Sequence, residues 1–266
     1  MSDPRPARLN VHGIAVDIVH RGEGRPLLFL HSDRGVEPEA PWLDCLARHW
    51  RVIAPTHPGF GHSDLPGWFS SMDDLALFYL DLAEALDLKE ALLVGVSFGG
   101  WIAAEIAVRS RARFAGLVLA DALGIKVGDR ETRDIVDFQG VSLEVLDRLA
   151  WHDPAKAARD YAIMSEHDLI GLARSREAFA LYGWRPYMHR PQLRHWLHRI
   201  AMPTLVLWGE SDRIVTPAYG RSYADLIPGA RFETIAEAGH YPHLEQPDAF
   251  ARAVEAFAAS SEGARR

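Results

Sequence analysis

The chain has 266 residues, of which 48% are hydrophobic and 24% charged, and its formal net charge is −7 at pH 7. These values are ordinary for a globular protein and speak against a disordered or membrane-resident chain. Lysine and arginine are scattered among the acidic residues without a basic stripe, so we expect no nucleic-acid partner.

Short β-rich runs alternate with helical patterns along most of the chain. Strands are predicted at residues 14–19, 27–30, 51–54, 91–95, 116–120, 204–208 and 231–235. From the third onward most of them are continuously apolar, which is typical of a parallel sheet covered on both faces. A helix is predicted to begin at Ser71, with Asp74 three residues after the cap, and a last helix to open at Pro247. The alternation predicts an α/β fold.

Residues 123–199 interrupt this alternation and contain helical patterns only, at residues 143–149, 154–164, 175–182 and 192–200. A helical insertion between two core strands would lie over the carboxyl ends of the strands, where ligands bind in open α/β sheets. We therefore predict a core of residues 1–122 and 200–266 and a helical cap of residues 123–199. The cap is rich in large aromatic residues, and we expect most of them to pack between cap helices.

Residues 92–104 combine an apolar strand, a Gly-x-Ser-x-Gly motif and a helix of small residues. In a nucleophile elbow, a strained turn between strand and helix lifts a serine hydroxyl clear of the sheet. Gly95 and Gly99 flank the turn, where a side chain would collide with a neighbouring strand or helix. The flanking strand and helix make the motif far more specific than its five residues alone. We predict that Ser97 is a nucleophile rather than a structural serine.

With this motif the chain resembles the α/β-hydrolase family, and further matches lie in the expected order. Residues 27–35 are similar to the strand and oxyanion loop of that family, and residues 55–64 to its D-x-P-G-x-G-x-S loop. Residues 204–212 resemble the strand that leads to the triad acid, and residues 238–245 the histidine loop. The resemblance implies a mostly parallel central sheet of about eight strands, with helices on both faces and an inserted helical cap.

The resemblance also implies a catalytic triad of Ser97, Asp212 and His240. Ser97 needs a base within hydrogen-bond reach, and His240 lies in the expected loop. Asp212 would hold the imidazole Nδ1–H and stabilise the imidazolium ion. Asp121, at the end of the preceding strand, is a rival acid, but residues 209–217 match the family pattern more completely.

The oxyanion hole is predicted to consist of the backbone N–H groups of Phe98 and Asp33. The chain departs from the family here, because Ser32 stands where glycine is usual and the acidic Asp33 follows it. A carboxylate beside a developing oxyanion is unfavourable, so we expect the Asp33 side chain to point to solvent or to pair with Arg34. The candidates for the substrate pocket are Ser32, Trp151, Trp184, Arg185 and Tyr241.

The leading interpretation is a serine hydrolase that cleaves an ester or lactone of a small, largely apolar substrate through an acyl-enzyme. One alternative is a carbon–carbon bond hydrolase of a meta-cleavage-type diketone acid, and another is a slow-turnover ligand receptor on the same fold. Ser97 argues against the carboxylate nucleophile of epoxide hydrolases and haloalkane dehalogenases.

No cofactor and no metal are expected. Nucleotide-binding fingerprints are absent, and His195 and His198 have no third ligand at a suitable spacing. Cys45 is the single cysteine and cannot form an internal disulfide, and the first eight residues carry no apolar leader. We therefore expect a cytoplasmic protein that binds a small-molecule substrate and no membrane. The oligomeric state stays open.

Overall fold

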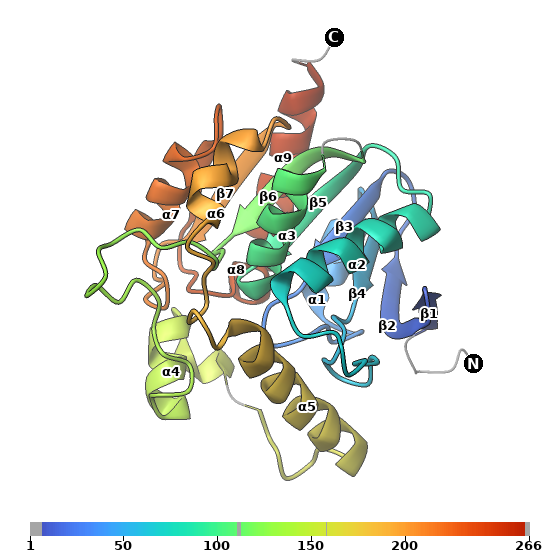
Figure 1. Ribbon diagram of the computed structural model, residues 1–266, viewed down its shortest axis with the longest axis vertical. Coiled ribbons are helices and arrows are strands. Elements are labelled where there is room, and N and C mark those ends of the chain that lie inside the picture. The colour runs from blue at the N-terminus through green and yellow to red at the C-terminus, as the bar shows by residue number, and fades with distance from the viewer. Residues whose placement is uncertain (1–6, 111–112, 158, 264–266) are drawn as a thin grey trace.

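The computed structural model describes residues 7–110, 113–157 and 159–263, and an eight-stranded sheet forms its centre (Figure 1). The spatial order of the strands is β1-β2-β4-β3-β5-β6-β7-β8. The pairs β1–β2 and β2–β4 are antiparallel, and all other pairs are parallel. The strands are Ala7–Val11 (β1), Ile14–Arg21 (β2), Pro26–Leu30 (β3), Arg51–Pro55 (β4), Ala91–Val96 (β5), Phe114–Ala120 (β6), Thr204–Gly209 (β7) and Arg231–Ile235 (β8).

All seven predicted strands are present, and β1 is the strand that the sequence analysis did not predict. It pairs with β2 across a tight turn in which His12 and Gly13 both have positive φ, 48° and 88°. Its residues are mostly exposed and carry no continuous apolar run, so the local pattern gave little sign of a strand.

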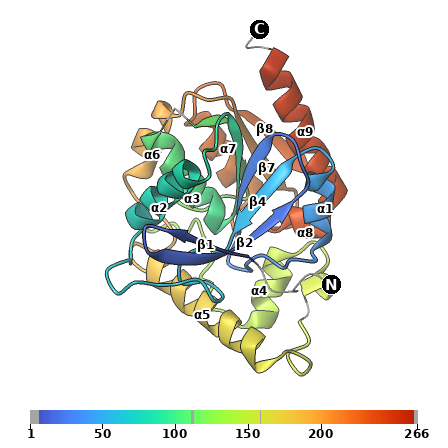
Figure 2. The same cartoon turned by 90° about the vertical axis from the view of Figure 1, so that its right-hand side faces the viewer.

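Helices cover both faces of the sheet (Figures 1 and 2). Alternate residues of the central strands face two separate apolar clusters, with Leu28 and Leu93 in one and Leu27 and Leu92 in the other. Burial on both faces explains the continuously apolar strands. The first cluster includes residues of α2 (Met72–Ala85), α3 (Phe98–Arg109) and α7 (Pro217–Asp225), and the second includes residues of α1 (Pro41–Ala47) and α9 (Pro247–Gly263).

Helix α2 begins where the sequence predicts. The Ser71 hydroxyl accepts a hydrogen bond from the Asp74 N–H at 3.1 Å, and the Asp74 carboxylate accepts one from the Ser71 N–H at 2.9 Å. This reciprocal pairing satisfies two amides that would otherwise lack partners at a helix start.

Among the described residues between β6 and β7, regular structure is helical. It consists of α4 (Leu143–Ala150), a 3₁₀ helix (Pro154–Ala157), α5 (Glu166–Gly183), α6 (Leu193–Trp196) and a second 3₁₀ helix (Leu197–Arg199). Of the helix predicted at residues 154–164, the described residues are helical only in the first 3₁₀ turn, and residue 158 lies outside the described part. Ser165 caps a new helix by accepting from the Asp168 N–H at 3.1 Å, so α5 begins at Glu166, earlier than residue 175.

The parallel strands bring the loops that follow them to one edge of the sheet. The carboxyl ends of β3, β5, β6, β7 and β8 lie next to one another along the strand order. In open α/β sheets ligands bind at this edge. Separately, no helix in the described part of the chain is long and apolar enough to span a membrane.

Candidate active site

Ser97 occupies a strained turn between β5 and α3. Its backbone angles are φ 54° and ψ −114°, a region that residues other than glycine rarely adopt. The Ser97 N–H donates to the Ala120 carbonyl at 2.8 Å, which ties the turn to β6. A Cβ atom at Gly99 would lie 2.0 Å from the Leu30 carbonyl oxygen, so only glycine fits there. These contacts fix the serine at the edge of the sheet.

Ser97, His240 and Asp212 form one hydrogen-bonded chain. The Ser97 Oγ lies 2.7 Å from His240 Nε2, and His240 Nδ1 lies 2.8 Å from Asp212 Oδ2. All three side chains are at most 1% exposed. In this geometry the imidazole can take the serine proton while the carboxylate stabilises the imidazolium ion.

Asp212 is held by backbone groups as well as by the histidine. Its Oδ1 accepts hydrogen bonds from the Ile214 N–H at 2.8 Å and the Val215 N–H at 3.3 Å. The rival acid, Asp121, uses its Oδ1 to accept from the Gly209 N–H at 2.9 Å. The imidazole is therefore hydrogen-bonded to Asp212, while the hydrogen bond that Asp121 accepts comes from the backbone.

The loop that carries His240 packs against the end of α4. A Cβ atom at Gly239 would lie 2.2 Å from the Ala150 carbonyl oxygen, and the His240 N–H donates to that oxygen at 2.6 Å. On its other side, the Gly239 N–H donates to the buried Glu245 carboxylate at 2.6 Å. The position of the base thus depends on contacts with the segment between β6 and β7.

The predicted oxyanion loop rests on two buried, stacked histidines, a feature that the sequence analysis missed. The rings of His31 and His57 lie 3.6 Å apart, and the His57 N–H donates to His31 Nε2 at 2.9 Å. His31 Nδ1 therefore carries the ring proton and donates to the Ser32 carbonyl at 2.5 Å. His57 Nε2 lies 2.9 Å from the His31 carbonyl, and its Nδ1 contacts Tyr79 Oη. Burial lowers the pKa of His31 to about 4 and that of His57 well below its ordinary value.

The two N–H groups predicted to form the oxyanion hole belong to Phe98 and Asp33, which follow β5 and β3. Phe98 is the first residue of α3, so its N–H has no acceptor within the helix. Asp33 follows β3 in the loop that His31 and His57 support. Ser32 Oγ accepts a hydrogen bond from the Arg34 N–H at 3.2 Å, so the Ser32 side chain forms a contact inside its own loop.

The Asp33 side chain differs from our expectation. Its carboxylate accepts a hydrogen bond from Tyr241 Oη at 3.0 Å and lines a cavity beside the triad. The Arg34 guanidinium lies instead over the aromatic rings of Trp151 and Tyr241, 5.1 and 5.6 Å from their centroids. The buried Tyr241 hydroxyl needs an acceptor, and the two ring faces offer Arg34 a favourable site. The expectation of a solvent-facing or Arg34-paired carboxylate is therefore wrong.

The cavity that Asp33 and Tyr241 line has a volume of about 410 Å³, and it adjoins the triad through neighbours of His240 rather than through the triad residues themselves. One of its walls, Phe138, lies with its ring centroid 6.1 Å from that of His240. Its polar or charged lining consists of Asp33, Arg34, Gln139, Asp147, Arg159, Tyr161, Arg176 and Tyr241, and its apolar lining of Phe138, Val141, Leu143, Leu146, Ala150, Ala157, Leu172 and Phe179. The sequence analysis missed most of these residues, because aromatic spacing alone does not tell a wall from a packed core.

The other predicted pocket residues lie farther from this cavity. Trp151 is buried against Tyr241, with ring centroids 5.3 Å apart, and lines a neighbouring hollow. Trp184, which is 62% exposed, and Arg185 line a separate surface hollow of about 640 Å³. The structure does not bring Trp184 and Arg185 to the triad.

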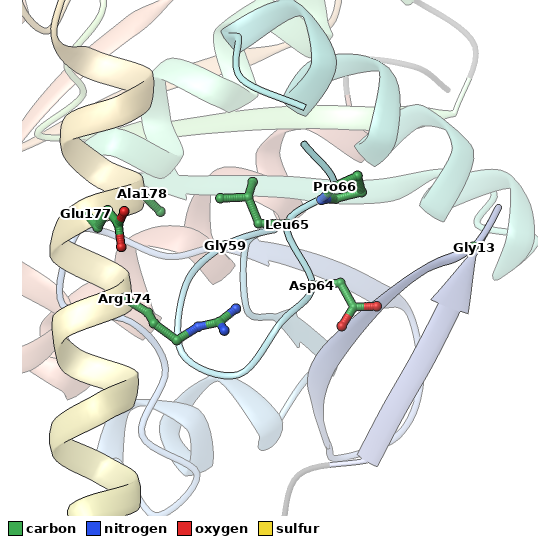
Figure 3. Close-up of a pocket in the computed structure, with 8 residues that line it drawn as sticks. All are labelled: Gly13, Gly59, Asp64, Leu65, Pro66, Arg174, Glu177 and Ala178. Carbon is green, nitrogen blue, oxygen red and sulfur yellow. The ribbon is translucent and has the colours of Figure 1, made fainter. Parts of the chain in front are cut away.

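A further hollow, of about 460 Å³, lies between α5 and the loop that contains Gly59 and Leu65 (Figure 3). Arg174 of α5 points toward this loop and donates to the Ser63 carbonyl at 2.7 Å. None of the triad residues lines the hollow, and neither do Phe138 and Tyr241, the neighbours of His240 that line the cavity of about 410 Å³, so we assign it no part in the chemistry.

Comparisons with known proteins agree with this architecture. Residues 27–253 match the model of the alpha/beta hydrolase family. The chain is 30% identical over 267 positions to the 2-hydroxymuconate semialdehyde hydrolase of Pseudomonas sp. (strain CF600), covering 95% of this chain and 93% of that protein. It is 27% identical to the 2-hydroxy-6-oxo-6-(2'-aminophenyl)hexa-2,4-dienoic acid hydrolase of Metapseudomonas resinovorans, covering 94% and 89%.

Among solved structures, a meta-cleavage product hydrolase from Pseudomonas fluorescens IP01 superimposes with a TM-score of 0.77 at 23% identity. The match covers 97% of this chain and 99% of that one and shows a shared fold. Taken with the family match over most of its length, this places the chain in the alpha/beta hydrolase family, and it is a hydrolase by that membership.

Proposed function

We propose that this chain is a carbon–carbon bond hydrolase that acts on a meta-cleavage-type diketone acid. The observation that carries the proposal is a complete Ser–His–Asp arrangement beside a cavity that offers both guanidinium groups and apolar walls. The names of the similar proteins describe hydrolases of such acids and semialdehydes. They support the alternative from the sequence analysis better than its leading ester or lactone interpretation.

The charged and the apolar parts of the cavity wall match the carboxylate end and the ketone end of such a substrate. Arg159 and Arg176 can bind a carboxylate, because a guanidinium stays charged and presents paired N–H donors. Burial and the nearby Arg34 lower the pKa of Arg159 from its ordinary value, and an arginine remains protonated at neutral pH despite such a shift. Phe138 and Phe179 supply an apolar wall for the substituent on the ketone.

The proposed reaction adds water across one carbon–carbon bond. Ser97 Oγ attacks the ketone carbon while His240 Nε2 takes the hydroxyl proton. The N–H groups of Phe98 and Asp33 receive the developing oxyanion. In the diketone tautomer a CH₂ group lies between the ketone and the conjugated C=C–C=O unit, and the bond between the ketone carbon and this CH₂ group then breaks. The electron pair passes through the conjugated double bond to the distal carbonyl oxygen, which takes the proton from His240. Water, deprotonated by His240, cleaves the acyl-enzyme and releases a carboxylic acid beside the dienoic acid.

A substrate panel tests the proposal directly. The panel contains 2-hydroxy-6-oxo-hexa-2,4-dienoic acids with alkyl or phenyl groups on the ketone, p-nitrophenyl esters of increasing chain length, and a lactone. We expect kcat/KM for the best dienoic acid to exceed that for the best ester by about 100-fold or more, followed as loss of the dienolate absorbance. Faster cleavage of an ester or the lactone would refute carbon–carbon specificity. A burst without further turnover would favour the receptor alternative.

The role of Ser97 has its own test. A fluorophosphonate should add one label to Ser97, identified by peptide mass spectrometry, and Ser97→Ala should remove both the label and at least about 1,000-fold of the turnover rate. Ser32→Ala is the matched control, because this neighbouring buried serine has its hydroxyl engaged by the Arg34 N–H. Labelling at another residue in folded protein would show that the nucleophile is assigned wrongly.

A further inference from the structure

A second carboxyl group lies beside the triad and has no part in the mechanism above. Asp121 directly follows β6, is fully buried, and has a φ of 45°. That left-handed conformation costs energy in residues other than glycine and is tolerated best by asparagine and aspartate. The fold therefore keeps this carboxyl group buried although both its burial and its backbone conformation cost free energy.

Asp121 is close enough to Asp212 for the two groups to interact. One oxygen of each carboxyl and one nitrogen of His240 all lie within 4.8 Å of one another. The other carboxylate that acts on Asp121 is Glu245, more weakly. Within the described ranges, the charged or titratable groups around Asp121 are thus two carboxyls and an imidazole.

The two carboxyl groups differ in how many donors they receive. Asp212 accepts from two backbone N–H groups and from His240. Asp121 accepts from the Gly209 N–H alone, and its Oδ2, buried within the described part of the chain, has no hydrogen-bond partner. Two neighbouring carboxyl groups in a buried site cannot both ionise, and the one that accepts more hydrogen bonds keeps the negative charge. Burial, and then the charge of Asp212, raise the pKa of Asp121 well above its ordinary value.

We propose that Asp121 is a positioning residue that carries a proton in the resting enzyme and directs its O–H toward Asp212. This role rests on the proposed function of Ser97, His240 and Asp212. The neutral O–H group supplies Asp212 with a further donor and adds no negative charge beside His240. Asp212 then stays ionised and fixed in the position in which it accepts from the imidazole.

Two substitutions distinguish the effect of a neutral hydrogen-bonding group at position 121 from the effect of having no side chain there. Both replacement residues tolerate the positive φ of this position. Asp121→Asn keeps a neutral group that can accept from Gly209 N–H and donate to Asp212, and Asp121→Gly removes both contacts without straining the backbone. The first readout is the rate of Ser97 labelling by a fluorophosphonate as a function of pH. We expect Asp121→Asn to stay within about threefold of the unmodified chain with the same pH midpoint, and Asp121→Gly to label about tenfold or more slowly.

The second readout is spectroscopic and needs no substrate. An infrared difference spectrum of the resting protein at neutral pH, unmodified minus Asp121→Asn, should contain the carbonyl stretch of a protonated carboxylic acid. Its failure to appear would overturn the proposal. So would a pH midpoint about one unit lower in Asp121→Asn, because loss of a negative charge beside His240 lowers the imidazole pKa.

Two other results would also overturn it. Unchanged labelling in Asp121→Gly would show that the group only fills space, and a divalent cation bound between the carboxyls would leave Asp121 ionised. Failure of the dienoic acid panel alone would alter neither readout, so the two proposals fail separately.

Discussion

The Asp212 carboxylate accepts three hydrogen bonds, and only one of them comes from His240. Asp212→Asn can keep the backbone contacts, but an amide nitrogen facing Nδ1 forces the imidazole into the tautomer that cannot accept the Ser97 proton. We expect the turnover rate to fall by about 10⁴-fold with the fold retained. Steady-state kinetics and circular dichroism measure both, and Asp121→Asn is the control that should change the rate little. A loss in Asp121→Asn larger than in Asp212→Asn would reverse the assignment of the acid.

Asp33 brings a negative charge to a cavity that we propose binds an acid. Asp33→Asn removes this charge, so kcat/KM for a carboxylate substrate should rise by about three- to tenfold, mainly through a lower KM, since repulsion in a partly buried site is worth about 1 kcal/mol. A neutral ester should change by less than the acid does. Tyr241→Phe is the matched control, because it removes the hydroxyl that donates to Asp33 and leaves the charge in place. An unchanged or higher KM in Asp33→Asn would show that the carboxylate assists substrate binding.

The roles of single residues could be predicted from the sequence where those residues belong to a short local motif. Ser97 lies in a turn whose glycines are required within a few residues, and His240 follows Gly239 in a recognisable loop. The contact of Tyr241 with Asp33 joins residues 208 positions apart and has no local signal. The stacking of His31 on His57, and the approach of Asp121 to Asp212, likewise depend on how separate loops meet.

At the scale of elements, Glu245 joins the histidine loop to the segment that follows α4. Its carboxylate accepts from the Gly239 N–H at 2.6 Å, and from the N–H groups of His152 and Asp153, each at 3.0 Å. Glu245 is 5% exposed, so water cannot replace it as the acceptor. Glu245 therefore positions His240 indirectly, through the backbone on either side.

Glu245→Gln should weaken this connection, because one carboxylate oxygen becomes an NH₂ group that faces backbone donors. We expect a loss of about 1–3 kcal/mol in the free energy of unfolding and a lower kcat with little change in KM. Urea denaturation and steady-state kinetics measure the two effects. Glu233→Gln, on the exposed face of β8, is the control and should change neither. Equal stability of the two variants would show that the buried contacts contribute nothing net.

Elements were predictable to the extent that their signals are local. The central strands are apolar along their whole length, and the start of α2 is set by Ser71 and Asp74, three residues apart. Between β6 and β7 the pattern suggested helices but misjudged their bounds at residues 154–164, because Ser165 starts a new helix. Which side chains of that segment face the cavity depends on packing, and the sequence analysis therefore named Trp184 as a candidate and did not single out Phe138 and Phe179.

For the whole molecule, three buried histidines make stability depend on pH. Burial lowers the pKa of His31 to about 4, that of His243 to about 3, and that of His57 well below the ordinary value of 6.5. The folded chain keeps these side chains neutral, while the unfolded chain protonates them below pH 6.5. Their stabilising contribution is therefore complete above that pH and is lost as the pH falls toward the folded-state values. Asp121 acts in the opposite sense, because its raised pKa lets unfolding release a proton.

Between about pH 6 and pH 4.5, unfolding should take up three protons at these three histidines and release one at Asp121, so these four groups together give a net uptake of two; half-buried His20, whose pKa burial also lowers, acts in the same direction as the three. Each proton corresponds to about 1.4 kcal/mol per pH unit, so the free energy of unfolding should fall by roughly 2.7 kcal/mol per unit. His243 packs against Phe29, Trp42 and Phe250, and its buried Nδ1 has no hydrogen-bond partner among the residues that the structure describes. His243→Phe keeps a ring in this apolar place and removes one titrating group. Its slope should be about half that of the unmodified chain, measured by urea denaturation at several pH values. Identical slopes would show that His243 is already protonated in the folded protein or never gains a proton on unfolding.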